Sequence, residues 1–400
     1  MAELSLLSAA PRDLFTGKKV LVRVDFNVPL KEGRIADDTR IRRALPTIEH
    51  LLKLGASPLI MSHLGRPSGS GFEEAYSLKV VADHLQELLN VPVKYASDTV
   101  GARAVAQAKA LGSQEVLVLE NLRFDAREKQ NDSGFAQELA ALGDAYVNDA
   151  FGCAHRAHAS VSALAKLLPS FAGFLMENEL INLGSILDNP ARPFVSILGG
   201  SKVSDKIKII SSLIEQSDTL IIGGAMCFTF LKAQGYQVGT SLVQDDWCNL
   251  CLELLEKAQA KGCKLLLPVD VVCADSLSPD AQAQVCSIDA IPQDSMGLDI
   301  GPATQELYAS EIARAKTAFW NGPMGVFEIE QFAQGTHAVA EALADNASAH
   351  TIIGGGDSVA AVNLFNLANK MSFISTGGGA SMAFVQGDIM PGVEPLVRDK

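Results

Sequence analysis

No stretch of the sequence is apolar for long enough to span a bilayer, which takes about 20 residues in a helix. The first residues, MAELSLLSAAPRDL, also lack the basic segment and apolar core of a secretory signal. These absences argue against a transmembrane helix and against export. We therefore expect a cytoplasmic protein with no membrane partner.

The chain has only seven cysteines, which is an odd number, and they form no regular pattern. Cys248 and Cys251 form a C-x-x-C, but they lie in a helical pattern with no second pair and no nearby histidine. A disulfide framework and a zinc site are therefore not expected, and we interpret the cysteines as reduced thiols.

Basic residues are outnumbered, because 33 Lys and Arg stand against 46 Asp and Glu and give a net charge of −13. This negative field opposes binding to nucleic acid. Only 16 residues are proline and 48% are hydrophobic, which excludes a disordered or collagen-like chain. A length of 400 residues predicts about two globular domains.

Short β-branched runs alternate with amphipathic helical patterns along the chain. This alternation predicts an α/β protein with two doubly wound, Rossmann-like parallel sheets. In the first half we expect strands at 18–24, 57–61, 115–120 and 144–148, and in the second half at 193–198, 218–222, 263–272, 316–320, 350–354 and 371–376.

The boundary between the two domains is expected after the last strand of the first half. Residues 176–189 have a helical pattern and are followed by Pro190 and Pro193, so they are the best candidate for a connecting segment. A helix transmits rigid-body rotation better than a Gly/Ser tether, which makes this segment a candidate hinge.

Cationic and amide side chains follow the strands of the first half, where ligands of open parallel sheets bind. Twelve of the fourteen arginines lie between Arg12 and Arg192. Converging guanidinium groups indicate a small, multiply anionic ligand, whereas arginines elsewhere on helix faces are expected to be solvated. The candidates at the strand ends are Arg23, Asp25, Asn27, His63, Arg66, Asn121, Arg123, Asn148 and Asp149.

Glycine pairs and triplets end four strands of the second half, at 199–200, 223–224, 354–356 and 377–379. Glycine lets the backbone turn sharply and bring N–H groups against a phosphate or a base, so the pattern predicts a nucleotide site. We place Lys202 and Lys206 one helical turn apart at a helix start, where both reach phosphate oxygens. Asp357 can hold a magnesium ion on the phosphates, and Glu328 a ribose hydroxyl.

The common nucleotide fingerprints are missing. There is no G-x-x-x-x-G-K-[ST], and no G-x-G-x-x-G follows the first strand. From the residues alone, two alternatives stay open beside a phosphotransferase: a nicotinamide dehydrogenase on two doubly wound domains, and a non-catalytic anion-binding module.

The whole chain resembles the phosphoglycerate kinase family. The resemblance rests on RVDFNVPL, SHLGRP, ENLRF, AHRAHAS, GFLMENEL, LGGSKVSDK, WNGPMGVFE, IIGGGDS and STGGGAS, in this order. It implies an N-terminal domain over 1–175 for 3-phosphoglycerate, an inter-domain helix over 176–189, and a nucleotide-binding domain over 190–385. Residues 386–400 would form a tail that returns to the first domain.

The resemblance also implies roles for single residues. The glycerate ligand would meet Asp25, Asn27, Arg40, His63, Arg66, Arg123 and Arg156, with Arg40 as the catalytic cation. Lys202 and Lys206 would act on the phosphates, and Glu328 on the ribose. The remaining nucleotide contacts would be Gly223, Gly224, Asn321, Gly354, Gly355, Gly356, Asp357 and Ser358, with Mg²⁺ held by Asp357.

The implied reaction is 1,3-bisphosphoglycerate + MgADP ⇌ 3-phosphoglycerate + MgATP, a step of glycolysis and gluconeogenesis, catalysed by a monomer. The acceptor in the reverse direction is an ionised carboxylate, so no general base is required, and catalysis falls to positioning and to cations. The chain departs from the family at Asn178, where Lys is common, and at Ala383, where Glu is common. Both lie outside the implied ligand contacts.

Overall fold

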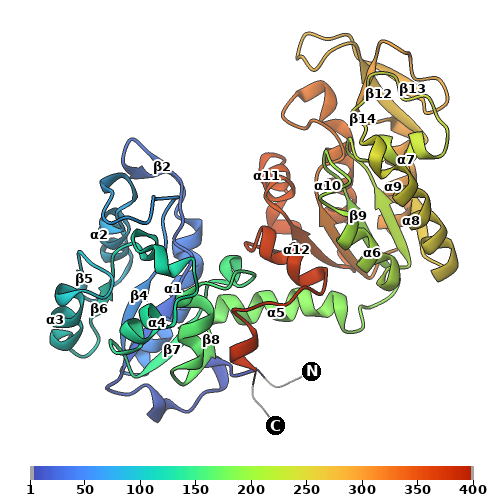
Figure 1. Cartoon of the computed structure of the whole chain (residues 1–400). Helices are drawn as coiled ribbons and strands as arrows, with labels where there is room; N and C mark the ends of the chain where they lie inside the picture. The colour runs from blue at the N-terminus through green and yellow to red at the C-terminus, as the bar shows by residue number, and fades with distance from the viewer. Residues whose placement is uncertain (1–3, 398–400) are drawn as a thin grey trace. The chain divides into compact units, whose positions relative to one another are not determined.

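The computed structural model describes residues 4–397, and the chain divides into two compact units. The first unit comprises the residues up to Ile181 and those from Asp388 onward, and the second comprises Asn182–Gly387. Each contains a six-stranded parallel sheet flanked by helices (Figure 1). The predicted α/β class with two doubly wound sheets is confirmed.

The sheet of the first unit has the strand order β5-β6-β4-β1-β7-β8. Its strands are β1 (Lys19–Arg23), β4 (Ser57–Met61), β5 (Val93–Tyr95), β6 (Val116–Val118), β7 (Ala145–Asn148) and β8 (Ser170–Ala172), and a hairpin is formed by β2 (Leu30–Lys31) and β3 (Arg34–Ile35). The helices are α1 (Thr39–Lys53), α2 (Lys79–Leu88), α3 (Ala102–Ala110), α4 (Ser133–Ala140) and α5 (Phe174–Leu187).

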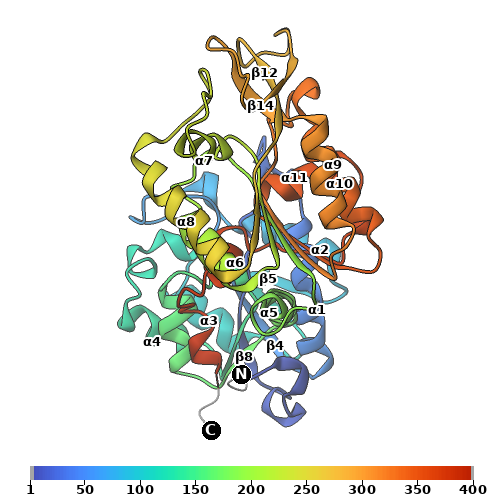
Figure 2. The ribbon, with the colours of Figure 1, turned by 90° about the vertical axis from the view of Figure 1, so that its right-hand side faces the viewer.

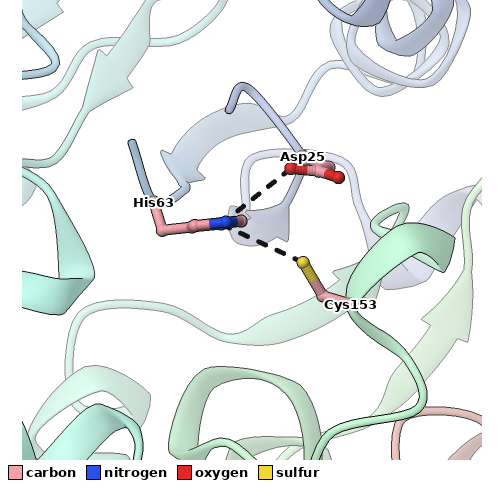
Figure 3. A group of neighbouring side chains, drawn as sticks. All are labelled: Asp25, His63 and Cys153. Carbon is pink, nitrogen blue, oxygen red and sulfur yellow. Dashed lines mark hydrogen bonds and ion pairs between the residues drawn. The ribbon is translucent and has the colours of Figure 1, made fainter. Parts of the chain in front are cut away.

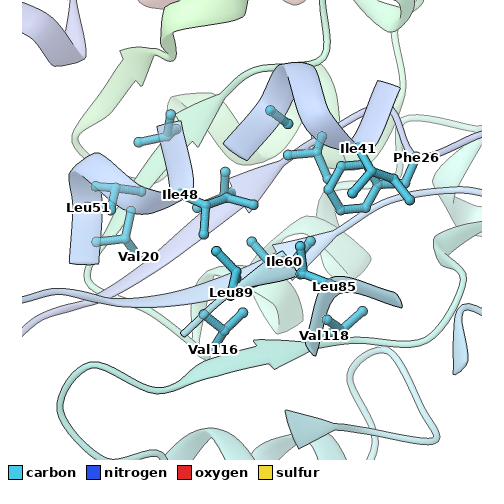
Figure 4. Packing of buried hydrophobic residues seen from close by; sticks show 14 of the residues in the cluster. Val20, Phe26, Ile41, Ile48, Leu51, Ile60, Leu85, Leu89, Val116 and Val118 are labelled. Carbon is cyan, nitrogen blue, oxygen red and sulfur yellow. The ribbon is translucent and has the colours of Figure 1, made fainter. Parts of the chain in front are cut away.

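Both faces of this sheet are buried, because alternate residues of each strand enter different cores. Val20 and Val22 of β1 pack with side chains of α1 and α2, such as Ile48 and Leu85 (Figure 4). Leu21, between them, packs on the opposite face with residues of α3 and α4. The continuous β-branched runs in the sequence follow from this two-sided burial.

The sheet of the second unit has the order β11-β10-β9-β15-β16-β17. Its strands are β9 (Phe194–Leu198), β10 (Thr219–Ile222), β11 (Lys264–Leu266), β15 (Thr317–Asn321), β16 (His350–Gly354) and β17 (Phe373–Ile374). The helices are α6 (Ile207–Gln216), α7 (Cys227–Ala233), α8 (Cys248–Lys261), α9 (Pro302–Ile312), α10 (Gln334–Asp345), α11 (Gly356–Leu364) and α12 (Gly379–Val385).

A second, antiparallel sheet was not expected from the sequence. It has the order β13-β12-β14, formed by β12 (Asp270–Ala274), β13 (Gln284–Ser287) and β14 (Met296–Ile300), and β12 and β14 lie at one end of the unit (Figure 2). The single strand predicted over 263–272 is wrong. Pro268, which lacks a backbone N–H, lies in the gap between β11 and β12 and marks the change of sheet.

The first residues of helices α6 and α8 bear on the predictions made for the two lysines and for the C-x-x-C pair. Helix α6 begins at Ile207 with Lys206 as its N-cap residue, so Lys202 lies in the preceding loop and not on a helical turn with Lys206. The prediction of two lysines one turn apart is therefore wrong. Cys248 and Cys251 lie within α8 as expected.

The segment after Asp388 belongs to the first unit. Asn148 Nδ2 donates to the carbonyl of Gly392 at 3.0 Å, and the Gly392 N–H donates to the carbonyl of Ala154 at 2.9 Å. Residues 398–400 of the predicted tail lie outside the described residues. Within 4–397, no helix combines the length and the apolarity needed to cross a bilayer.

Candidate active site

The carboxyl ends of the strands in the first unit bring together most of the cationic residues predicted there. The fields of Arg23, Arg123, Arg156 and His158 all act on the imidazole of His63. These side chains come from the ends of β1, β4 and β6 and from the segment after β7. The geometry is that of an anion site built at one edge of a parallel sheet.

Arg40 is tied to this edge by an ion pair. It lies in the first turn of α1, and its Nη1 donates to Asp25 Oδ2 at 2.7 Å. The Arg40 side chain remains 40% exposed, whereas that of Asp25 is 17% exposed. The pair therefore orients a guanidinium group that solvent and ligands can still reach.

The turn after His63 is held by residues from two other strand ends. The N–H of Gly65 donates to Asn27 Oδ1 at 2.8 Å, and Arg123 Nη1 donates to the Gly65 carbonyl at 2.8 Å. Arg123 Nε is buried without a hydrogen-bond partner among the described residues. A buried cationic donor without a partner indicates a position for an anionic ligand.

His63 is uncharged in this setting. Its side chain is buried, and burial lowers the pKa of the ring well below its usual value, with the positive charges of Arg23, Arg123 and Arg156 adding to the effect. His158 has its pKa lowered to about 4, mainly by burial and then by the same arginines. The anion site therefore relies on arginines for its charge.

Asp25, His63 and Cys153 place one potential metal-ligand atom each within 4.8 Å of one another (Figure 3). The spacing is that of a metal site, but the charges are not. Arg23 Nη2 lies 3.3 Å from His63 Nδ1 and 3.7 Å from Cys153 Sγ, and burial raises the pKa of the Cys153 thiol to about 11. A guanidinium group among the three ligands repels a divalent cation, so the cluster does not fit one.

Three arginines of the predicted set differ in exposure. Arg23 is only 1% exposed, and its guanidinium contacts protein groups on three sides. Arg66 is exposed on the turn after Gly65 and takes part in none of the hydrogen bonds and ion pairs described for this edge of the sheet. Arg156 is also exposed and donates from Nε to His155 Nε2 at 3.1 Å.

The second unit has a cavity of about 290 Å³ at the carboxyl ends of its strands. Lys206 Nζ donates to Asn321 Oδ1 there, and Asn321 Nδ2 is buried with no partner among the described residues. Burial lowers the pKa of Lys206 to about 8, although Asp357 and Asp205 oppose the shift. The lining residues include Gly199, Gly200, Ser201, Lys202, Asp205, Lys206, Asn321, Gly355, Gly356, Asp357, Ser358, Gly378 and Gly379.

Glycine is required at two turns in this region: Gly355 lines this cavity, whereas Gly224 lines the cavity of about 350 Å³ described next. Gly224 has φ +63°, and a Cβ there would lie 2.4 Å from the backbone nitrogen of Gly200. Gly355 has φ +86°, and its Cβ would lie 2.8 Å from Asn321 Nδ2. Side chains at these positions would displace the backbone that shapes the two cavities.

A neighbouring cavity of about 350 Å³ is mostly apolar, with Phe228, Leu298 and Val326 among its lining residues. Glu328 also lines it, and Gly200, Ser201 and Asp357 line both cavities. An apolar pocket beside a glycine-rich, lysine-bearing one has the form of a nucleoside site next to a phosphate site.

Three predicted nucleotide residues have close neighbours within the protein. Gly223 and Gly354 are buried and line neither cavity, since the space beside them is filled by Met324 and Phe319. Ser358 lines the cavity that contains Lys206, and its hydroxyl accepts the N–H of Gly322 at 2.6 Å.

Sequence reasoning missed several residues of these sites. Cys153 follows β7 closely and could have been found from its strand-end position. Asp299 lines the mostly apolar cavity from β14, and Glu128 and Ser160 lie beside Arg23. Nothing in the sequence brings the last two together, because 32 positions separate them.

A cationic strand edge on one α/β unit and a glycine-rich, lysine-bearing cavity on another are the features that we expect of a two-domain α/β kinase. A family model described as phosphoglycerate kinase matches residues 12–388. The phosphoglycerate kinase of Herpetosiphon aurantiacus is 58% identical over 383 residues, covering 96% of this chain and 97% of that protein. That of Moorella thermoacetica is 54% identical over 399 residues, covering 100% of both.

A solved structure of phosphoglycerate kinase from Coxiella burnetii matches with a TM-score of 0.91 and 42% identity, and covers 98% of each chain. The chain belongs to the phosphoglycerate kinase family. It is therefore an ATP-binding transferase of glycolysis with phosphoglycerate kinase activity. The alternatives of a nicotinamide dehydrogenase and of a non-catalytic module do not agree with this assignment.

Proposed function

We propose that the chain binds 3-phosphoglycerate or 1,3-bisphosphoglycerate at the cationic strand ends of its first unit and MgATP or MgADP in the two cavities of its second. The observation that carries this proposal is a pair of buried donors without partners among the described residues. Arg123 Nε is one, in the first unit, and Asn321 Nδ2 is the other, in the second. Each lies in a cationic setting that an oxyanion would complete.

On the acceptor side, the phosphate and carboxylate of 3-phosphoglycerate would be recognised by charged and polar donors. Arg123 and Arg156 supply charge beside His63, and Asn27 fixes the turn that leads to Arg66. Arg40, held by Asp25, is the cation that would act on the transferring phosphoryl group. Guanidinium groups suit this task because they stay charged and donate in a planar fork.

On the nucleotide side, the base and ribose would occupy the apolar cavity and the phosphates the cavity with Lys206. Glu328 lines the first cavity and can accept from a ribose hydroxyl. Asp357 lies in the first turn of α11 and lines both cavities. One carboxylate beside substrate phosphates fits Mg²⁺, which commonly takes one or two carboxylates and completes its shell with phosphate oxygens and water.

The proposed chemical step forms a bond between the carboxylate oxygen of 3-phosphoglycerate and the γ-phosphorus of ATP, while the bond from that phosphorus to the bridging β–γ oxygen breaks. The acceptor is already ionised, so the protein needs no base. Arg40, Lys202 and Lys206 would offset the charge on the transferring group, and the arrangement would hold the reacting atoms in line. The reverse step makes ATP.

Direct transfer of the phosphoryl group requires the reacting atoms to lie within about 3.5 Å of each other. The two proposed half-sites belong to different units. We propose that the units approach when both substrates are bound, with α5 as the hinge helix, since a ligand shifts an equilibrium only by its differential affinity. Small-angle scattering should give the smallest radius of gyration for the ternary complex. An unchanged radius with binding confirmed would contradict closure.

The function is tested by mixing the purified chain with MgATP and 3-phosphoglycerate and trapping the acyl phosphate with an NADH-dependent dehydrogenase. NADH oxidation should require both substrates and should stop in excess EDTA. Activity that persists undiminished in EDTA would contradict the magnesium requirement. The monomeric state and the cytoplasmic location stay predictions, for which sedimentation and localisation of the tagged chain are the tests.

A further inference from the structure

The buried arginine at the end of β1 contacts a ring nitrogen of the site histidine. Arg23 Nη2 lies 3.3 Å from His63 Nδ1, and both side chains are almost fully buried, at 1% and 3% exposure. A guanidinium group can only donate, so Nδ1 must accept. The single proton of a neutral ring then lies on Nε2, which leaves Nε2–H as the hydrogen-bond donor of His63.

Arg23 is also fixed at its other two guanidinium nitrogens, Nε and Nη1. Its Nε donates to Ser160 Oγ at 2.9 Å, and its Nη1 donates to the carbonyl of Val24. The Ser160 hydroxyl in turn donates to Glu128 Oε1 at 2.6 Å, and the Ser160 N–H donates to Glu128 Oε2 at 2.9 Å. Each hydrogen bond therefore has one possible direction, from Arg23 through Ser160 to Glu128.

The charges agree with this order. Glu128 is 0% exposed and supplies a carboxylate that stabilises the buried guanidinium through Ser160. Although burial opposes the charged form of Arg23, the neighbouring acidic groups, Cys153, Glu128 and Asp25 among them, raise its pKa overall. Arg23 therefore stays a donor at every working pH and cannot exchange roles with His63.

Two further groups lie near Nδ1 of His63. Asp25 Oδ1 is 3.9 Å away, beyond hydrogen-bond distance, although its charge would attract a protonated ring. Cys153 Sγ, also at 3.9 Å, is within the longer hydrogen-bond distance of sulfur, and its thiol, whose pKa burial raises to about 11, can donate to Nδ1. Arg123, Arg156 and His158 oppose a positive ring. Within this set of neighbours the neutral ring is the favoured state.

We propose that Arg23 is a positioning residue, held by Ser160 and Glu128, that fixes His63 as the neutral Nε2–H tautomer so that it donates to an oxygen of 3-phosphoglycerate. This assignment rests on the proposed acceptor site and changes the expected role of Arg23 from a ligand contact to a support for His63. A neutral Nε2–H donor stays the same across physiological pH, whereas an imidazolium would lose its charge and one of its two N–H donors near the ordinary pKa of about 6.5.

The direct test is a long-range ¹H–¹⁵N correlation spectrum of the full chain labelled with [¹⁵N]histidine, with the His63 signals assigned by their loss in His63→Gln. The wild-type chain should show His63 as the Nε2–H tautomer from pH 5.5 to 8. An Nδ1–H tautomer, or an imidazolium at pH 7, would overturn the proposal without the need for any other variant.

Variants of Ser160 test the support. Ser160→Ala removes the hydroxyl between Arg23 and Glu128, so His63 should populate both tautomers and titrate at higher pH. KM for 3-phosphoglycerate should rise by about fivefold to tenfold, as expected for one weakened charged hydrogen bond, with a smaller change in kcat. Ser160→Thr keeps a hydroxyl and should restore the tautomer, and Ser162→Ala, a buried serine of the same segment, should leave it unchanged.

Thermal unfolding of each variant shows whether it is folded at the assay temperature. A folded Ser160→Ala whose His63 keeps the wild-type tautomer and titration would overturn the positioning role. Addition of 3-phosphoglycerate separates this inference from the proposed function. An Nε2–H signal that does not respond to saturating 3-phosphoglycerate would contradict the acceptor site, while the tautomer itself would still support the role of Arg23.

Discussion

Arg40 Nη1 donates to Asp25 Oδ2 at 2.7 Å, so a carboxylate at the end of β1 orients the cation proposed to act on the transferring phosphoryl group. Because both side chains remain partly exposed, the pair adds little to the stability of the unit. Its value lies in orientation, since a guanidinium held on one side presents its remaining N–H groups in a fixed direction.

Arg40→Ala should lower kcat by about 10³-fold or more, because a cation at the transferring group is worth that much in phosphoryl transfer. KM for 3-phosphoglycerate should change far less. Steady-state kinetics in the coupled assay measure both. Arg42→Ala is the matched control, since Arg42 lies on the same helix and pairs with Asp38 on the surface. A near-normal kcat with a raised KM would make Arg40 a binding residue only.

Lys206 should make nucleotide binding depend on pH. Burial lowers its pKa to about 8, so the positive charge in the cavity of the unliganded chain is present below pH 8 and is lost as the pH rises through 8. KM for MgATP should therefore increase above pH 8, by at most about tenfold per pH unit. In Lys206→Arg this rise should be absent up to pH 9.5, because guanidinium stays charged.

Lys206→Ala should raise KM for MgATP by about tenfold to a hundredfold, since a hydrogen bond to a charged group contributes roughly 1.5–3 kcal/mol. Lys208→Ala, at an exposed position of the same helix, is the control. Wild-type KM values that are flat between pH 7 and 9.5 would mean that Lys206 does not bind phosphate in its charged form.

Gly224→Ala should destabilise the second unit by about 2 kcal/mol or more and abolish nucleotide binding. Its φ of +63° is unfavourable for alanine, and the new Cβ would lie 2.4 Å from the backbone nitrogen of Gly200. Gly235→Ala has a similar backbone cost, with φ +95°, but meets no atom within 4 Å. Urea unfolding and MgADP titration should be measured for both variants. Gly224→Ala combines a steric clash with backbone strain, whereas Gly235→Ala has the backbone strain alone. Equal effects would show that the close approach of the two turns does not matter.

Asp299 should give the second unit a stability that increases on mild acidification. Burial raises its pKa to about 7, although it accepts the N–H groups of Gly335 and Ile300 at 2.6 and 2.9 Å. Between pH 8 and 5.5 the folded carboxyl takes up a proton that the unfolded chain does not hold, so the free energy of unfolding rises as the pH falls.

Asp299→Asn removes this titration, so the stability of the wild type relative to the variant should increase from pH 8 to pH 5.5. Both tryptophans, Trp247 and Trp320, lie in Asn182–Gly387, and their fluorescence during urea unfolding reports this unit. A difference that stays constant with pH would show that Asp299 is ionised throughout.

The sequence was sufficient for the two parallel sheets as a class and for most of their strands, although β5, β8 and the antiparallel sheet were not predicted. Strand ends followed by Arg or Gly could be read directly, because both faces of each parallel sheet are buried and the strands are continuous apolar runs. The same rule misread 263–272, where a mostly apolar run passes from one sheet to another through Pro268. Hydrophobicity alone does not distinguish a long strand from two short ones.

The orientation of Arg23 could not be predicted in this way. Its place at the end of β1 was correct, but it lies on the same face of the strand as Leu21, toward the segment with Tyr146 and Ser160. Which segment covers a strand end depends on contacts between distant residues, as the pair of Ser160 and Glu128 illustrates. The position of Lys202 could not be predicted for the same kind of reason. The residue at which α6 begins depends on how the preceding loop packs, and Val203 of that loop is buried.

The central claim, direct transfer between two bound substrates without a protein nucleophile, is tested most directly by the stereochemistry at phosphorus. The chain is given 3-phosphoglycerate and ATP made chiral at its γ-phosphorus by oxygen isotopes and sulfur, and the configuration of the transferred group is determined. One in-line displacement predicts inversion. Retention would require two displacements through a covalent intermediate on the protein and would contradict the account.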